Sequence, residues 1–344
     1  MDWVTGPRVI DDLASTRRAA ATFLEDFGAP DSASGHSDWA AKWTKIGDAH
    51  DLLGDANINK GQTDDAERAW LCALTSFELA KRLAREDAAE CEKATAKIEA
   101  TARKVGALGQ KIERVPVKCY DQSEILTYYL SAAGRSKAPA VICISTEEET
   151  ATTLLGRLLP VLVDRGISVL VVAHEDISDS SDHSDMALSC CLDYLSVRSD
   201  VDARRIGVYG DGLSAALATQ LALSDRRVAA AVCDGGLWNL ARMLASTQWL
   251  AGTADVSHED VVSACRSRMI QRFKCPVLVV ASSRGIVSLP EASKLLSHAS
   301  PAPIDLQLAM PQTITHLEEI EDFVTFDERI FGWLEHKLLP NSAS

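Results

Sequence analysis

The sequence lacks an excess of positive charge. Its 35 lysine and arginine residues stand against 49 aspartates and glutamates, which leaves a net charge of −14. Because nucleic acids are bound through their phosphates by clusters of Lys and Arg, we expect this chain to bind neither DNA nor RNA. The same deficit disfavours docking on anionic membranes, which attract basic segments. The expected partner is instead a small molecule.

Long apolar runs are also missing. No segment approaches the ~20 consecutive apolar residues that a helix needs to cross a bilayer. The first residues, Met1 to Arg8, contain no basic region followed by an apolar core, so no secretory signal is predicted. These two features favour a cytoplasmic protein.

Cysteines are present, but without a spacing that would organise them. There are nine, an odd number, and none forms a Cys-x-x-Cys pair. Disulfide frameworks and zinc sites need regular spacings, so we expect reduced thiols that mostly pack in the core. Cys190-Cys191, within a predicted helix, is interpreted as inert packing. The acidic segment from His174 to Asp185 matches no standard ligand set, so neither a metal nor another cofactor is expected.

Two kinds of periodicity divide the chain. In residues 1–110 apolar residues recur at helical spacing, as in Trp39, Trp43 and Ile46, which share one helix face with His50. This pattern predicts a helical N-terminal domain over 1–110. A second domain is predicted over 111–340.

The second domain alternates short apolar segments with helical ones. Strands are predicted at 138–145, 167–173, 205–209, 228–233, 276–281 and 304–309, after a β-hairpin around 121–123. This alternation indicates an α/β fold with a doubly wound, mostly parallel sheet and helices on both faces. Ligands bind such sheets at the carboxyl ends of the strands. The segment 237–272, which contains Trp238, is predicted to form a helical lid, although its apolar residues also suit plain helix packing.

The segment Ile206-Gly-Val-Tyr-Gly-Asp-Gly-Leu-Ser214 has the form of a buried strand, a tight turn and the start of a helix. In a G-x-S-x-G elbow, such a turn exposes a nucleophilic serine. Here Gly212 stands at the serine position, and Ser214 stands at the position of the last glycine. Ser214 would lie in the first helical turn, where a hydroxyl more often bonds to the backbone than acts as a displaced nucleophile.

The whole chain resembles the α/β-hydrolases with a helical N-terminal domain, such as the 2,6-dihydroxypseudooxynicotine hydrolases and the fermentation/respiration switch proteins. The resemblance rests on the elbow segment and on Trp39-x3-Trp43-x3-Gly47-x2-His50, Asp234-Gly-Gly236, Cys275-Pro-Val-Leu-Val-Val and His316. It implies the α/β-hydrolase fold and a homodimer.

The resemblance also implies a Ser–Asp–His triad, from which this chain departs. The nucleophile falls on Gly212, and the acid falls near Gly285, where no carboxylate stands. The oxyanion-hole glycines become Ser145-Thr146, and the next turn becomes His174–Asp179. Only the histidine persists, as His316. Because serine hydrolysis needs an activated hydroxyl, a base and a group that orients the base, conventional serine-hydrolase chemistry is not expected.

The first functional hypothesis is a serine-independent enzyme. It would bind a small aromatic or polyketide-like carbonyl compound and catalyse an acid–base reaction such as cyclisation, elimination, decarboxylation or C–C cleavage. His316 and Asp211 are the candidate catalytic residues, and the backbone N–H of Leu213 is available to stabilise an oxyanion. The candidate substrate-binding residues are Gly212, Leu213, Ser145, Thr146, His174 and Trp238.

The second hypothesis is a catalytically dead pseudo-hydrolase that acts as a ligand receptor or as a partner subunit. In this interpretation Asp211 only places a favourable negative charge near a helix N-terminus. His316 would be a relic, paired with Glu318 or Glu319. Both hypotheses remain open at the level of sequence.

Overall fold

The computed structural model describes residues 12–27, 36–109, 112–120, 122–132, 137–178, 184–234, 272–280, 306–309 and 322–339. Nearly all of the predicted lid at 237–272, with Trp238, lies outside these residues. So do Gly285, His316 and a helix expected at 290–298. The chain divides into two compact units, one of residues 1–113, 152–164 and 313–329 and one of residues 114–151, 165–312 and 330–344.

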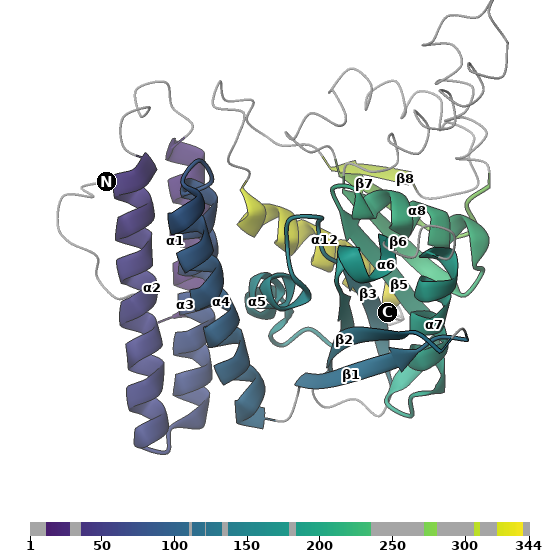
Figure 1. Ribbon diagram of the computed structural model, residues 1–344, viewed down its shortest axis with the longest axis horizontal. Helices are drawn as coiled ribbons and strands as arrows, with labels where there is room; N and C mark the ends of the chain where they lie inside the picture. The colour runs from purple at the N-terminus through teal and green to yellow at the C-terminus, as the bar shows by residue number, and fades with distance from the viewer. Residues whose placement is uncertain are drawn as a thin grey trace, which may run out of the picture. The chain divides into compact units, whose positions relative to one another are not determined.

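The first unit contains four helices at the start of the chain, which confirms the predicted helical N-terminal region (Figure 1). They are α1 (Leu13–Phe27), α2 (His36–Asn59), α3 (Thr63–Leu83) and α4 (Ala88–Gly109). The predicted aromatic face of α2 is packed as expected. Phe23 of α1 contacts Trp39 and Trp43, with ring centroids 5.0 and 5.6 Å apart.

The same unit holds a buried ion pair. Besides the four helices, the unit includes most of α5 (Ala151–Leu162) and the first turns of α12 (Phe323–Leu338). Arg157 of α5 and Asp327 of α12 approach to 3.9 Å, and their side chains are 3% and 4% exposed. Since an isolated buried charge is very costly, the two opposite charges compensate one another at this position.

The second unit is built on one eight-stranded sheet (Figure 1). Its strands lie in the order β1-β2-β4-β3-β5-β6-β7-β8. β2 runs antiparallel to β4, and every pair from β4 through β3 to β8 is parallel, which confirms the predicted fold class. The strands are β1 (Ile112–Lys118), β2 (Glu124–Leu130), β3 (Ala138–Ile144), β4 (Ser168–Val172), β5 (Val201–Asp211), β6 (Val228–Asp234), β7 (Val277–Val280) and β8 (Leu306–Ala309).

β3 and β4 are almost entirely apolar, as strands buried on both faces are. Every residue of β3 and of β4 is buried. Residues of α7 (Ser184–Val197) and α8 (Ser214–Ser224) join the strands in one continuous core, among them Leu188, Leu192 and Leu221. A short helix, α6 (His174–Ser178), follows β4 where the sequence predicted only a rewritten turn. The core fixes the strand ends, which carry the polar residues discussed next.

Candidate functional site

Neighbouring strands of the sheet end side by side at one edge. Ile144 at the end of β3 is paired with Val172 of β4 and with Gly210 of β5. The residues that follow these positions therefore emerge close together, as the parallel sheet predicts. They are the candidate residues Ser145, Thr146, His174, Asp211, Gly212 and Leu213.

The connection between β5 and α8 is a tight turn that depends on glycine. Gly212 has a φ of +61°, in the left-handed region that glycine adopts without strain. A Cβ atom on Gly210 would lie 2.2 Å from the carbonyl oxygen of Ser214, so only glycine lets the strand and the helix approach so closely. The backbone N–H of Gly212 donates to the carbonyl oxygen of Asp234, 3.1 Å away, and ties the turn to β6.

Three polar side chains at this edge are linked by hydrogen bonds. The Ser214 hydroxyl oxygen lies 2.6 Å from His174 Nδ1 and 2.5 Å from the carbonyl oxygen of Ser145. The Ser145 hydroxyl accepts the backbone N–H of His174 at 3.0 Å and donates to the carbonyl oxygen of Glu149 at 2.7 Å. The structure thus places a histidine beside Ser214. His174 was selected from the sequence only as a binding residue.

The direction of these hydrogen bonds fixes the tautomer of His174. A carbonyl oxygen only accepts, so the single proton of the Ser214 hydroxyl goes to Ser145. His174 Nδ1 must then donate to the Ser214 oxygen. In the neutral imidazole the proton therefore lies on Nδ1 and the lone pair on Nε2. Within the described residues, the side-chain hydrogen bond of His174 is the one made by Nδ1.

This arrangement gives Ser214 a positioning role. Its side chain is fully buried, and its proton is held by a carbonyl oxygen. A nucleophilic serine instead gives its proton to a basic nitrogen, which Nδ1–H is not. The geometry thus agrees with the interpretation that the Ser214 hydroxyl bonds to the backbone. It adds that the hydroxyl orients the half-buried ring of His174.

The backbone N–H of Leu213, predicted to be available for an oxyanion, is already bonded. It donates to Glu147 Oε2 at 3.4 Å. A Cβ atom on Gly212 would lie 3.1 Å from the same carboxylate oxygen. Because the N-terminus of α8 favours negative charge, this carboxylate is stabilised there. An anionic group of a ligand would have to displace the exposed Glu147 side chain.

Two carboxylates lie on the paired ends of β5 and β6. Asp211 is aligned with Asp234, and both residues are buried. Thr146 is also buried, so its side chain offers little surface to a ligand. In the part of the chain that the structure describes, no group of three His, Cys, Asp or Glu side chains is arranged to hold a metal ion. Among the helices described, none combines the length and apolarity needed to cross a bilayer.

Comparison with solved structures identifies the architecture. The 2,6-dihydroxy-pseudo-oxynicotine hydrolase is similar over 94% of this chain and 96% of its own, with a TM-score of 0.59 and 17% identity. The esterase Pf2001 of Pyrococcus furiosus is similar over 68% of this chain and 93% of its own, with a TM-score of 0.51 and 15% identity. No protein-family model and no curated protein sequence matches the chain. At these identities the likeness establishes a shared fold.

Proposed function

Because the chain has the α/β-hydrolase fold, we propose that the strand ends around Gly212 bind a small carbonyl compound and promote an acid–base reaction without a serine nucleophile. The substrate is of aromatic or polyketide-like type. The reaction is a cyclisation, elimination, decarboxylation or C–C cleavage. One observation carries the proposal: the hydrogen bonds of Ser214 make His174 Nδ1 a donor, so the lone pair of the neutral ring lies on Nε2.

A neutral imidazole with one oriented lone pair suits proton abstraction next to a carbonyl group. As His174 Nε2 takes up a proton, positive charge develops on the ring. The Ser214 oxygen accepts the Nδ1–H bond and stabilises this charge, and the Ser145 carbonyl polarises the Ser214 hydroxyl in turn. The chain of three groups thus assists the base without forming a covalent intermediate.

The other polar positions take supporting roles in this proposal. Gly212 leaves the turn without a side chain, so no acyl-enzyme forms there. The N–H of Leu213 binds the carbonyl oxygen of the substrate once Glu147 has moved. Asp211 and His316 remain candidates for the acid that returns the proton. The protein is further proposed to be a cytoplasmic homodimer.

Deuterium exchange tests this function without knowledge of the full reaction. Carbonyl compounds retained by the purified protein from a metabolite extract would be identified by mass spectrometry and incubated with it in heavy water. We expect deuterium to enter at the carbon next to the carbonyl group. His174→Gln should slow this exchange at least about tenfold, since general bases contribute about that much or more. His336→Gln, in the last turn of α12, serves as the matched control and should leave the rate unchanged.

Two results would overturn the assignment. If His174→Gln exchanged deuterium at the native rate, His174 would not be the base. If only His316→Ala abolished exchange, the base would be His316 and the Ser214 hydrogen bonds would be structural.

A catalytically inactive ligand receptor or scaffold subunit is the second candidate, and Glu147 is the observation that favours it. Its carboxylate holds the Leu213 N–H, the donor that an enzyme of this type would leave for the substrate. In this case compounds would be retained but not exchanged. Glu147→Ala would then increase retention of anionic compounds without producing turnover.

A further inference from the structure

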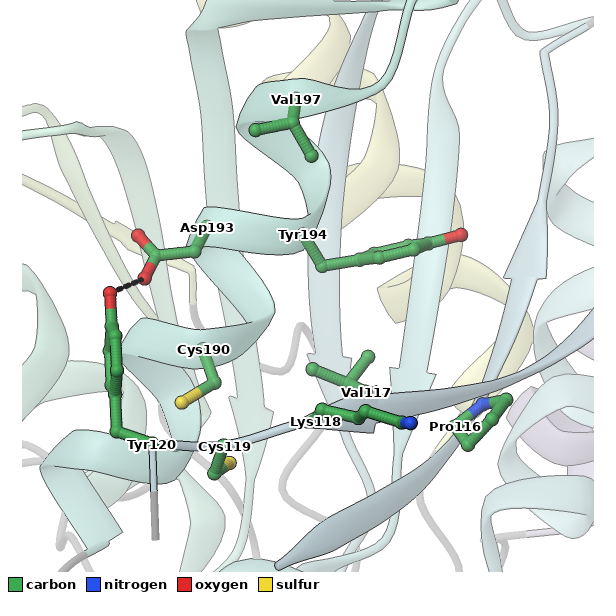
Figure 2. A pocket seen from close by; sticks show the side chains of 9 residues that line it. All are labelled: Pro116, Val117, Lys118, Cys119, Tyr120, Cys190, Asp193, Tyr194 and Val197. Atoms are coloured by element: carbon green, nitrogen blue, oxygen red, sulfur yellow. Dashed lines mark hydrogen bonds between the residues drawn. The ribbon is translucent and has the colours of Figure 1, made fainter. Parts of the chain in front are cut away.

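A second candidate site lies away from the strand ends, between β1 and α7. A pocket of about 330 Å³ is lined by residues 116–120 and by four residues of α7. Figure 2 shows the side chains of Cys119 and Cys190 between the strand and the helix, below Asp193 and Tyr194. The pocket therefore places two thiols from distant parts of the sequence on one small surface.

The two thiols are direct neighbours. Both line the pocket, Cys119 just after the end of β1 and Cys190 from α7. Cys119 also packs against the core cluster to which Cys190 belongs. Both cysteines are free thiols in the structure.

Backbone hydrogen bonds join the residues on either side of the turn that carries Cys119. The N–H of Cys119 donates to the Ser123 carbonyl oxygen at 2.9 Å, and the N–H of Gln122 donates to the Cys119 carbonyl oxygen at 3.0 Å. The Tyr120 hydroxyl then donates to Asp193 of α7 at 3.0 Å, as Figure 2 shows. The Tyr120–Asp193 hydrogen bond thus holds the turn against the helix beside the thiols, which reduces the entropy lost when the thiols are joined.

We propose that Cys119 and Cys190 form a reactive pair that is converted to a disulfide by a low-molecular-weight disulfide such as oxidised glutathione. The exchange proceeds in two steps. The Cys119 thiolate attacks one sulfur of the oxidant and releases the first small thiol, which leaves a mixed disulfide on Cys119. Cys190 then attacks the Cys119 sulfur, gives up its proton and releases the second small thiol. Two protein thiols are oxidised and one small disulfide is reduced to two thiols.

Exposure decides the order of attack. Cys119 is half-buried and reachable from the pocket, whereas Cys190 is only 3% exposed. Burial raises the pKa of Cys190 to about 12, so this thiol does not react first. Once Cys119 carries the mixed disulfide, the Cys190 sulfur lies beside it. This proximity raises the rate of the second attack and compensates for the high pKa of Cys190. The neighbouring Cys191 is fully buried, and burial also raises its pKa.

The test uses the full chain in its reduced form, treated with oxidised glutathione over a range of glutathione ratios. Peptide mapping without reduction should show the peptide of Cys119 joined to that of Cys190, lighter by two hydrogen atoms than the sum of the two. Cys119→Ser and Cys190→Ala should each abolish this cross-link. Cys91→Ser changes another half-buried cysteine, in α4, and should leave the cross-link yield unchanged.

Several results would overturn the proposal. One is recovery of Cys119 only as a stable glutathione adduct, with Cys190 still open to alkylation. Another is complete resistance of Cys119 to oxidation. A cross-link that survives in Cys190→Ala would assign Cys191 as the partner instead. Circular dichroism of each variant separates loss of reactivity from loss of fold, and Cys119→Ser, at a half-buried position, provides the result least dependent on core packing.

Discussion

Two regions of the molecule bury polar side chains, and they differ in whether a polar atom of the group stays available to a ligand. In the helical unit, Arg157 and Asp327 face each other with almost no exposure. At the strand ends, Ser214 is equally buried but is bonded to Nδ1 of a histidine that is only half-buried, and among the described residues the other ring nitrogen makes no hydrogen bond. The first arrangement exposes almost none of its polar atoms, whereas the second places an imidazole at the edge where this fold binds ligands. A buried polar group therefore indicates function only when part of its network remains available.

The largest effect on stability is expected from removing one partner of the Arg157–Asp327 ion pair. Asp327→Ala removes the carboxylate that faces the buried Arg157 charge and should lower the free energy of unfolding by about 3–5 kcal/mol. Asp65 of α3, 49% exposed and paired with the 61% exposed Arg68, is the control. Asp65→Ala should cost no more than about 1 kcal/mol. Equal costs in chemical denaturation would show that water reaches Arg157, and the contrast between the two regions would fail.

A smaller loss is expected at the strand ends. Ser214→Ala removes both the acceptor of the His174 Nδ1–H and the donor to Ser145, which should cost about 1–3 kcal/mol. Ser224→Ala, at the exposed end of the same helix, should stay within about 0.5 kcal/mol. The variant should also weaken deuterium exchange, because His174 loses its orientation. Unchanged exchange at reduced stability would limit Ser214 to a structural role.

The glycine turns sharpen the comparison further, since each region has one glycine with positive φ. Gly212→Ala should cost about 1–2 kcal/mol through left-handed strain, and Gly61→Ala about the same. A Cβ on Gly61 meets nothing within 4 Å, whereas one on Gly212 meets Glu147. Any excess cost at Gly212 should therefore disappear in a Glu147→Ala background, as a double-mutant cycle would measure. If the additional cost of Gly212→Ala persists without Glu147, its cause is backbone strain and not contact with the Glu147 side chain.

The smallest effect concerns acid stability. The guanidinium of Arg198 holds the pKa of the Asp200 carboxyl below its usual range, against the opposing effect of burial. A lowered folded pKa stabilises the protein above the unfolded value of about 3.9, and this stabilisation is lost as pH falls through the folded pKa. Asp200→Asn should therefore make unfolding less dependent on pH below about 4. An unchanged slope in acid titration would show that this pair, more exposed than Arg157–Asp327, is screened by water.

The sequence was sufficient to predict the fold. Continuous apolar strands such as β3 and the helical spacing of Trp39 and Trp43 report burial directly, and the structure confirms both. It was also sufficient to select His174 and Ser214 as positions near the ligand edge. Their pairing was missed because 40 residues separate them, and only the sheet register brings β4 and β5 to the same edge as β3.

The role of Glu147 could not be foreseen for a related reason. Nothing in the segment Ser145-Thr-Glu147 indicates that its carboxylate meets the backbone N–H of a residue on another strand's turn. The proximity of Cys119 and Cys190 could not be predicted for the same reason, because no residue next to either cysteine in the sequence indicates it. Local patterns encode secondary structure and burial, whereas contacts between loop ends follow from the tertiary arrangement.

The central claim, that Ser214 fixes His174 with a basic Nε2, is tested most directly by nuclear magnetic resonance of the imidazole nitrogens. Protein labelled with isotopic nitrogen in its 8 histidines would be compared with His174→Gln to assign the His174 signals. At neutral pH we expect Nδ1 to carry the proton and Nε2 to be unprotonated. A proton on Nε2, with Nδ1 accepting from Ser214, would contradict the account and would make Ser214 and His174 a serine–histidine pair.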